Sequence, residues 1–427
     1  MQKLFKIIQI IVSFNLIKIT RNFILYFFSL FIPKSKKFIL IGGWFGNRFA
    51  DNSKYLYLHV NNNLKNLGFK KAIWISRDFD IVKELNDNGY CAYQLWSIQS
   101  IWYHFRSYFH VIDQSYKDIN SIFSIRSKRI HLWHGFPLKR IGNIGRYINN
   151  EVYDKTIPLQ TESRILTLLN KVKSHGFWSD YFLLGTSELS AQIMSKAFNV
   201  KEKNMLVSGY PRNFSPIFNT SLNFLLTSEK KTYQNLESLK NSDYKLFGYF
   251  PTFRDKTETL LLGTSNINEV LEFLDFCEIN KVKIICKFHS AEKNTGDELL
   301  DLHPGLINLP ANHDIYSYID LIDVVLTDYS SVGFDFLLWE RPVIFYPYDL
   351  KYYSNLDRKL IFDYEEFTPG PKVYTLNELK KIILKPLDEL ATEYTNKYGA
   401  HANRVKKILY GQFEKYDINH LIEEIRK

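Results

Sequence analysis

Residues 324–339 read VVLTDYSSVGFDFLLW. The apolar run Val324–Leu326 predicts a short buried strand, and Ser331–Trp339 predicts a helix that begins soon after it. A strand that passes through a few polar residues into a helix is the building unit of a mostly parallel α/β sheet. This stretch therefore predicts the fold class and marks one strand end where polar groups gather.

The junction between this strand and helix has two interpretations. Ser330 and Ser331 stand at the helix start, where first-turn amides and the helix dipole favour an anion and the hydroxyls add donors. Alternatively, one serine is a plain N-cap and Asp335 lies in the first turn. Capping explains one serine but not necessarily two followed by Gly333, so we favour an anion site.

The same alternation of strands and helices extends through both halves of the chain. Between the halves, Phe214–Asp243 is polar and rich in Lys, Glu, Ser and Asn, as expected of an interdomain helix or linker. The predicted strands are Lys37–Ile41, Ala72–Ser76, His110–Asp113, Arg129–Leu132, Tyr181–Leu184, Leu206–Ser208, Tyr244–Phe250, Val282–Phe288, Leu306–Leu309, Val324–Leu326 and Pro342–Tyr346. The predicted helices are Ser53–Leu67, Phe79–Asn88, Asn266–Ile279, Ile315–Ile322, Ser331–Trp339 and Leu376–Leu384. Two such series predict two doubly wound domains facing a cleft, with ligands beyond the carboxyl ends of the strands.

Length and composition exclude several classes of protein. The 427 residues suffice for two or three domains at about 150 residues each. Hydrophobic residues make up 45% and charged residues 23%, which argues against disorder, collagen or a polytopic membrane protein. Three scattered cysteines argue against a disulfide scaffold. Without HExxH, GxxxxGK[ST] or GxGxxG motifs, we expect no metal and no cofactor.

The positive charge is concentrated at the N-terminus. Residues 1–50 contain eight Lys or Arg and no Asp or Glu, so they hold +8 of the net charge of +10. A nucleic-acid binder would carry a basic patch on its folded body as well, so we expect an anionic membrane surface and no nucleic acid. The apolar runs Ile7–Phe14 and Phe23–Ile32 are too short to span a bilayer. They predict an interfacial anchor, or alternatively an amphipathic helix docked on the protein's own body.

The most informative histidine follows the predicted strand Arg129–Leu132. In the segment LWHGFPLK, Gly135 permits a tight turn and His134 sits at that turn, where a sheet presents catalytic groups. An imidazole is the usual general base for an alcohol nucleophile, and Lys139 is placed to bind a phosphate. His131, inside the strand, is expected to be a hydrogen-bonded core residue.

Three further strand ends carry polar groups. GYPRN offers Arg212 for a bidentate phosphate contact, and YFPTFRD offers the Thr252 hydroxyl. In KFHS, Lys287 and His289 alternate around Phe288 and so point to one face, which suits a pyrophosphate. The remaining histidines that we considered lack ligand spacing and are expected at the surface: His175, His303 and His313.

Taken together, these motifs resemble those of the bacterial CDP-glycerol glycerophosphotransferases of teichoic-acid and capsule synthesis. The resemblance runs from about residue 37 to 390 and rests on FADNSKYLY (49–57), LWHGFPLK (132–139), GYPRN (209–213), YFPTFRD (249–255), KFHS (287–290), TDYSSVGFDF (327–336), RPVIFYPYDL (341–350) and FDYEEFTPGP (362–371). The chain departs from the usual pattern at Phe136, Phe214, Phe253 and Ser290, which leaves the charged groups intact.

The resemblance implies a GT-B-like fold and a peripheral enzyme at the cytoplasmic face of the membrane. It implies that His134 is the catalytic base, with His289 also catalytic, and that Asp51 and Asn52 lie on the acceptor side. The implied donor site comprises Gly135, Lys139, Arg212, Pro251, Thr252, Lys287, Ser330, Ser331 and Asp335. The implied organisation is a membrane segment (1–33), an acceptor-side domain (34–225), a CDP-donor domain (226–390) and a C-terminal helical segment (391–427).

The reaction implied is the transfer of a polyol phosphate, glycerol phosphate first, from a CDP-linked donor to a hydroxyl of a lipid-linked or polymeric acceptor. CDP-glycerol and CDP-ribitol remain alternatives as donors. A nucleotide-sugar glycosyltransferase on the same fold is a second hypothesis, because fold alone does not determine chemistry. A non-catalytic membrane scaffold is a third, although a scaffold has no need for His134, His289 and the two serines.

Overall fold

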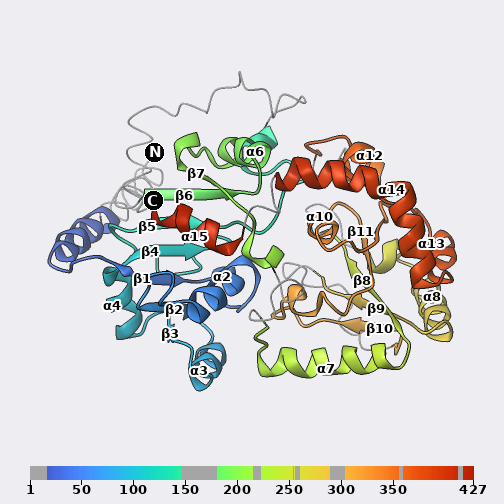
Figure 1. Ribbon diagram of the computed structural model, residues 1–427, viewed down its shortest axis with the longest axis horizontal. Coiled ribbons are helices and arrows are strands. Elements are labelled where there is room, and N and C mark those ends of the chain that lie inside the picture. Colours follow the sequence, from blue (N-terminus) through green and yellow to red (C-terminus); the bar gives the residue numbers. More distant parts are fainter. Residues whose placement is uncertain are drawn as a thin grey trace, which may run out of the picture.

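The computed structural model describes residues 17–146, 180–214, 223–252, 254, 260–288, 303–354, 359–411 and 417–427. The described chain forms two parallel sheets that face each other, one on the left and one on the right of Figure 1. His289 and the first apolar run, 7–14, lie outside these residues.

The N-terminal sheet has seven strands in the order β3-β2-β1-β4-β5-β6-β7. Its strands are β1 (Ser35–Ile41), β2 (Lys71–Ser76), β3 (Ala92–Gln94), β4 (Ser107–Ile112), β5 (Lys128–His131), β6 (Asp180–Gly185) and β7 (Met205–Val207). Leu40 of β1 pairs with Ile73 on one side and His110 on the other, both in parallel register. The strand order therefore reverses between β1 and β4, which is where ligands bind in open α/β sheets.

The C-terminal sheet has the same kind of topology, with the strand order β10-β9-β8-β11-β12. Its strands are β8 (Lys245–Phe250), β9 (Val282–Cys286), β10 (Leu306–Asn308), β11 (Val324–Thr327) and β12 (Val343–Phe345). Every strand pair is parallel, and the order reverses between β8 and β11. At these two reversal points, the carboxyl ends of the strands of both sheets lie at a common cleft.

Helices and short 3-10 turns connect these strands. The α-helices are residues 17–30, α2 (Asp51–Asn62), α3 (Phe79–Asp87), α4 (Ile98–Arg106), α6 (Glu188–Phe198), α7 (Thr227–Asn241), α8 (Ile267–Ile279), α10 (Val332–Leu337), α11 (Leu350–Tyr352), α12 (Tyr364–Phe367), α13 (Leu376–Ile383), α14 (Leu387–Tyr410) and α15 (Ile418–Arg426). The 3-10 turns are η1 (Trp44–Gly46), η2 (Gly142–Arg146), η4 (Glu202–Asn204), η5 (Pro211–Phe214), η7 (Leu261–Gly263) and η8 (Ile315–Tyr318).

The chain crosses between the domains twice. Helix α7 runs along the lower edge of Figure 1 towards the C-terminal sheet, and α14 leads back. The final helix α15 packs against the N-terminal domain, where Asn419 bonds His59 and Arg426 donates to the Leu67 carbonyl. The last helix thus belongs spatially with the first sheet, although it follows the second in sequence.

A hydrophobic core continues across the domain boundary. Phe136, which follows β5, lies 6.1 Å from the ring of Phe334 in α10 and 5.8 Å from that of Phe362, both in the C-terminal domain. Nearby, the backbone of Lys139 pairs antiparallel with Leu360. The two domains are therefore joined by packing and by main-chain hydrogen bonds, which fixes the geometry of the cleft between them.

The predicted α/β class with parallel strands is confirmed. All eleven predicted strands correspond to strands of the structure, with ends shifted by one to three residues. The predicted helix Ile315–Ile322 is wrong in length, because the helical turn η8 stops at Tyr318 and the chain must turn before β11 begins at Val324. Within the described residues, no helix is long and apolar enough to cross a membrane.

Candidate functional site

A cleft of about 180 Å³ lies where the carboxyl ends of both sheets meet. The N-terminal domain lines it with Trp44, Arg48, Ala50, Asp51, His134 and Arg212. The C-terminal domain lines it with Phe250, Pro251, Lys287, Phe288, His313, Asp314, Ile315, Tyr316, Ser330 and Val332. Residues predicted from separate strand ends, such as His134, Lys287 and Ser330, therefore come together in one cavity.

His134 occupies the turn that follows β5. The turn needs unusual backbone angles, with φ of 63° at Trp133 and 140° at Gly135. The His134 ring lies against the Trp133 ring at a tilt of 33°, with their centroids 4.0 Å apart, and the Trp44 ring lies 6.2 Å away. The two indoles thus flank the imidazole at the cleft wall, where it can meet a substrate.

Gly135 brings the two domains into close contact beside this histidine. A Cβ atom placed on Gly135 would lie 2.5 Å from Ser331 Oγ and 3.1 Å from Arg212 Nη2. No side chain fits there, and the positive φ angle independently favours glycine. The loop after β5 and the start of α10 are therefore in contact. The LWHGFPLK and TDYSSVGFDF motifs could form one shared site only if they lay this close together.

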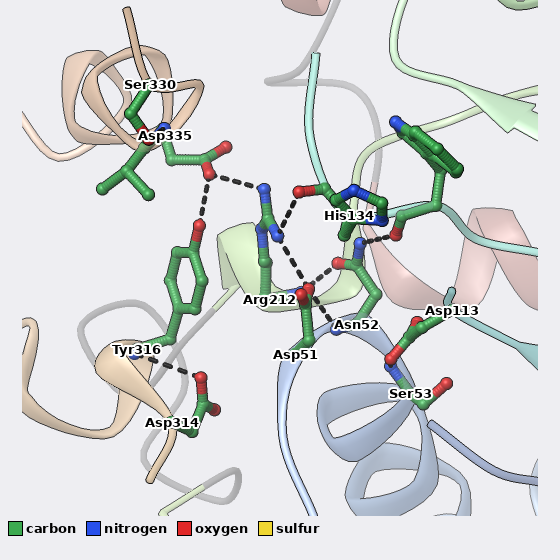
Figure 2. Close-up of polar contacts among 12 residues, drawn as sticks. Asp51, Asn52, Ser53, Asp113, His134, Arg212, Asp314, Tyr316, Ser330 and Asp335 are labelled. Carbon is green, nitrogen blue, oxygen red and sulfur yellow. Dashed lines mark hydrogen bonds and ion pairs between the residues drawn. The ribbon is translucent and has the colours of Figure 1, made fainter. Parts of the chain in front are cut away.

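Arg212 is the centre of a buried ionic network, shown in Figure 2. Its Nη1 lies 2.7 Å from Asp51 Oδ1 of the N-terminal domain, and its Nη2 lies 2.7 Å from Asp335 Oδ2 of the C-terminal domain. Nη1 also donates to the His134 carbonyl at 3.0 Å. The Arg212 guanidinium therefore bridges the two domains and holds the backbone of His134 in place.

Asp335 lies behind the cleft wall, since it is fully buried and does not line the cavity. Besides Arg212, it accepts hydrogen bonds from the hydroxyls of Tyr316 (2.6 Å) and Tyr410 (2.8 Å). Burial raises the pKa of Asp335, and the Arg212 guanidinium opposes that rise. These contacts hold Asp335 against the Arg212 guanidinium, and its place in the donor site, which the resemblance implied, stays a prediction.

Asp51 and Asn52 begin helix α2, at the strand-order reversal of the N-terminal sheet. Asp51 adopts a left-handed conformation with φ of 64°. The Asn52 amide nitrogen donates to the Trp133 carbonyl at 2.7 Å, and its oxygen accepts from the Arg212 backbone at 3.2 Å. Asn52 therefore supports the loop that carries His134, while Asp51 faces the cleft.

Two cations face the cleft from opposite domains. Lys287, just after β9, donates to the His313 carbonyl, and burial together with repulsion from Arg48 lowers its pKa to about 8. Arg48 lies over the Trp44 ring at 4.5 Å, and burial lowers its pKa while the carboxylates of Asp51 and Asp314 oppose that fall. Two cations that repel each other across a cavity are suited to binding an anion between them.

His313 corrects an expectation from the sequence. We expected a surface residue, but its side chain is only 3% exposed and lines the cleft. Its Nδ1 lies 2.7 Å from the Tyr318 hydroxyl, and burial lowers the pKa of His313 to about 4. By contrast, His131 is buried as expected, with its ring nitrogens bonded to Tyr181 Oη and the Asp113 carbonyl.

The two serines that follow β11 make no strong capping contacts, and Ser330 lines the cleft. Helix α10 begins at Val332, and the Ser331 side chain makes no cap hydrogen bond. The Val332 amide reaches Ser330 Oγ only at 3.5 Å, a distance that gives little capping energy. The N-cap interpretation is therefore poorly supported, and the Ser330 hydroxyl lines the cavity.

The remaining predicted donor residues differ in position. Pro251 lines the cleft after β8, while the adjacent Thr252 is buried and its backbone amide donates to Asp328 Oδ1 at 2.9 Å. Lys139 is not among the lining residues. His289 cannot be placed, because it lies outside the described residues. Among the residues that are described, no group of three or more His, Cys, Asp or Glu side chains could hold a metal ion.

Sequence reasoning missed several cleft residues, notably Trp44, Arg48, Asp314 and Tyr316. The signal for Trp44 and Arg48 was present, because they follow the first predicted strand and its Gly42-Gly43 pair. Asp314 and Tyr316 gave no such signal, since they precede a strand and reach the cleft through the 3-10 turn η8.

Comparison with known proteins gives a consistent result. The family model described as CDP-glycerol:poly(glycerophosphate) glycerophosphotransferase matches residues 24–415. The teichoic acid poly(glycerol phosphate) polymerase of Bacillus spizizenii is 26% identical, with 83% of this chain and 84% of that protein covered. The teichoic acid glycerol-phosphate transferase of Staphylococcus aureus is 28% identical, with 84% and 86% covered.

Solved structures show the same fold. The wall teichoic acid polymerase TagF superimposes with a TM-score of 0.64 and 20% sequence identity, covering 99% of this chain and 97% of that one. At this identity the likeness establishes the fold. It confirms the GT-B-like arrangement of two facing α/β domains that the sequence motifs implied.

Proposed function

This chain belongs to the CDP-glycerol:poly(glycerophosphate) glycerophosphotransferase family, and we propose that it builds a teichoic-acid-like polymer at the membrane. It is a transferase that moves glycerol phosphate from a CDP-linked donor to an acceptor hydroxyl. Two relatives named as a glycerol-phosphate polymerase and a glycerol-phosphate transferase match this chain over 84% and 86% of their own length, which supports that reaction. Relatives named as ribitol-phosphate polymerases match over only 45% of the chain.

The proposed chemistry is an in-line displacement at the phosphorus that carries the polyol. The acceptor oxygen bonds to that phosphorus, the bridging P–O bond of the pyrophosphate breaks, and CMP leaves with the electron pair. His134, held at the cleft wall by Trp133 and Trp44, takes the proton of the attacking hydroxyl. His289 remains a proposed catalytic partner from its place in the KFHS motif alone.

Charge in the cleft supports a phosphate-bearing substrate, and this observation carries the proposal. Lys287 and Arg48 approach the cavity from opposite domains, and the Ser330 hydroxyl adds a donor. A preorganised donor of this kind contributes about 3 kcal/mol to the stabilisation of developing charge. We assign the donor to the Lys287 side and the acceptor to the Asp51 side of the cavity.

Association with the membrane rests on an unusual helix. Residues 17–30 turn Asn22 and Ser29 towards the body, where both are buried, while Phe27 is 64% exposed and Phe31, just beyond, 72% exposed. A soluble helix has the opposite arrangement. We therefore propose that this face enters the headgroup region on the cytoplasmic side, with the basic N-terminal residues on anionic lipid.

The test is product analysis with purified full-length protein. CDP-glycerol, CDP-ribitol and a UDP-sugar are each supplied with a lipid acceptor, and products are identified by mass spectrometry. We expect a glycerol phosphate adduct with release of CMP, and the number of added units distinguishes single addition from polymerisation. Transfer from the UDP-sugar alone would instead establish the glycosyltransferase hypothesis.

A further inference from the structure

The exposed apolar surface does not end with residues 17–30. Just before and within helix α4, Trp96 is 59% exposed, Ile98 is 82% exposed and Trp102 is 51% exposed. Ile98 and Trp102 are four residues apart and so share one face of the helix. We call Trp96, Ile98 and Trp102 the α4 patch.

A chain of aromatic contacts joins the α4 patch to the N-terminal helix. Phe28 of that helix lies 5.6 Å from Phe105 in α4, measured between ring centroids. Phe105 lies 5.6 Å from Phe123, and Phe123 lies 6.2 Å from Trp96. Since Phe28 and Trp96 are both more than half exposed, the two surfaces are ends of one aromatic track.

Polar contacts fix the N-terminal helix, and the residues just after it, on α4 and the loop before β5. Arg126 donates to the Ser29 carbonyl at 2.7 Å, and Lys34 donates to the carbonyls of His104 and Ser107, both at 2.9 Å. Arg106 donates to the Pro33 carbonyl. The two exposed ends of the track are therefore held in fixed positions, joined through the buried ring of Phe105. The Arg106 guanidinium lies beside them, and a cation there complements anionic headgroups.

The direction of α4 relates this surface to the cleft. The Leu95 amide bonds to the Ser76 carbonyl at 2.8 Å, so Trp96 follows directly at the carboxyl end of β2. The other end of α4 leads into β4 at Ser107. The α4 patch thus begins at the edge of the sheet that carries the cleft, whereas residue 31 lies near the opposite edge, before β1.

We propose that the α4 patch is a second membrane-contacting element, which inserts its two indoles and Ile98 into the headgroup region of an anionic bilayer. This inference rests on the membrane association proposed above. Tryptophan is the residue favoured at membrane–water interfaces, because its ring is apolar and its N–H is polar. With contacts at both edges of the sheet, the bilayer lies along α4 and brings a lipid-linked acceptor towards the cleft.

The first test compares two triple variants of the full-length protein. Trp96→Ser, Ile98→Ser and Trp102→Ser removes the patch and leaves the N-terminal helix intact. The matched control, Ile279→Ser, Tyr352→Ser and Leu384→Ser, removes three exposed apolar side chains of the C-terminal domain. Binding is measured by co-sedimentation with vesicles of phosphatidylglycerol and phosphatidylcholine. We expect the patch variant to partition about tenfold more weakly and the control to match the wild type.

The second test needs no loss of apolar surface. Lipids brominated near the headgroup quench tryptophans that enter the bilayer, so wild-type fluorescence should fall on binding and the Trp96→Phe, Trp102→Phe variant should lose most of that quenching. Equal quenching in both proteins, or partitioning of the patch variant within twofold of the wild type, overturns the inference. So does concentration-dependent dimerisation without lipid that the patch variant loses, because the patch would then bind a second copy.

These outcomes separate the α4 patch from the broader proposal. Failure of the wild type to bind vesicles overturns both membrane proposals. Binding that depends on residues 1–33 but not on the patch overturns only this one. Transfer to a water-soluble acceptor analogue should be unchanged in both triple variants, which establishes that they fold.

Discussion

At the scale of single residues, Arg212 has the most contacts at the site. A guanidinium between carboxylates of two domains is stable only because both hydrogen bonds are short and its charge is compensated. The GYPRN motif predicted a phosphate contact for Arg212, and that contact stays a prediction. A sequence motif cannot distinguish an arginine that binds phosphate from one that holds two domains together.

We predict that Arg212→Met destabilises the protein strongly, because it leaves Asp51 and Asp335 buried without their cation. The expected loss in free energy of unfolding is about 3–5 kcal/mol, measured by denaturant titration. Arg404→Met is the control, since the Arg404–Glu366 pair is 52% exposed on both sides and should be worth less than about 1 kcal/mol. Comparable losses in the two variants would argue against a clamp at Arg212.

Lys287 should give the enzyme a pH dependence. Its pKa is lowered to about 8, so the ammonium is present at neutral pH and is lost as the pH rises through that value. Because the charged form binds phosphate, kcat/KM for the CDP-linked donor should fall above about pH 8. Lys287→Arg should keep the charge and shift this decline to higher pH, whereas an unchanged profile would assign the titration to another group.

His134→Ala should lower turnover by about 10²–10⁴-fold, the usual cost of losing a general base. The physical reason is its place at the cleft wall between the two indoles. Turnover and thermal unfolding are measured together, with His303→Ala as a control because His303 pairs with Asp275 outside the cleft. A His134 variant that keeps more than half of the wild-type rate would refute the assignment.

At the scale of elements, hydrophobic alternation was sufficient to predict most strands. It failed for β3, whose three residues are too few to show a pattern, and the prediction also omitted the helices α4 and α6.

The start of α10 allows a direct comparison of capping with anion binding. We predict that Ser330→Ala combined with Ser331→Ala raises the donor KM, since the Ser330 hydroxyl faces the cavity and neither side chain caps the helix well. The melting temperature should change little. An unchanged donor KM with a lowered melting temperature would restore the N-cap interpretation. Ser187→Ala is the reference variant, because it removes a hydrogen-bonded N-cap and so gives the fall in melting temperature that loss of a cap causes.

At the scale of the whole molecule, the cleft depends on contacts that no local pattern reveals. Arg212 is 161 residues from Asp51 and 123 from Asp335. A second buried bridge joins Lys54 of α2 to Glu229 of α7 at 3.3 Å and to Asp314 at 3.6 Å. The sequence predicted that strand ends would meet. It could not predict which charged side chains would form ion pairs between the domains and which would be left to bind a ligand.

The membrane proposal is tested by deleting residues 1–33. The truncated chain still begins before β1, so the catalytic body should fold and should process a soluble acceptor analogue. The deletion removes Lys3, Lys6, Lys18 and Arg21, each worth about 1 kcal/mol near an anionic surface. Vesicle binding should therefore weaken sharply, and binding of the full-length protein should weaken with salt and with loss of anionic lipid.

Three outcomes of this deletion have different meanings for how the molecule sits on the membrane. If the full-length protein resists high salt and only detergent extracts it, the run Phe23–Ile32 inserts deeply instead of lying at the surface. If the truncated protein binds as well as the intact one, the anchor lies elsewhere. If it keeps a weak, largely salt-independent affinity that disappears when Trp96, Ile98 and Trp102 are also changed to serine, the helix and the α4 patch act as two additive contacts. We expect this third outcome, because the deletion removes both the basic residues and the exposed phenylalanines of the N-terminal helix, whereas the α4 patch remains and binds by burial of apolar surface.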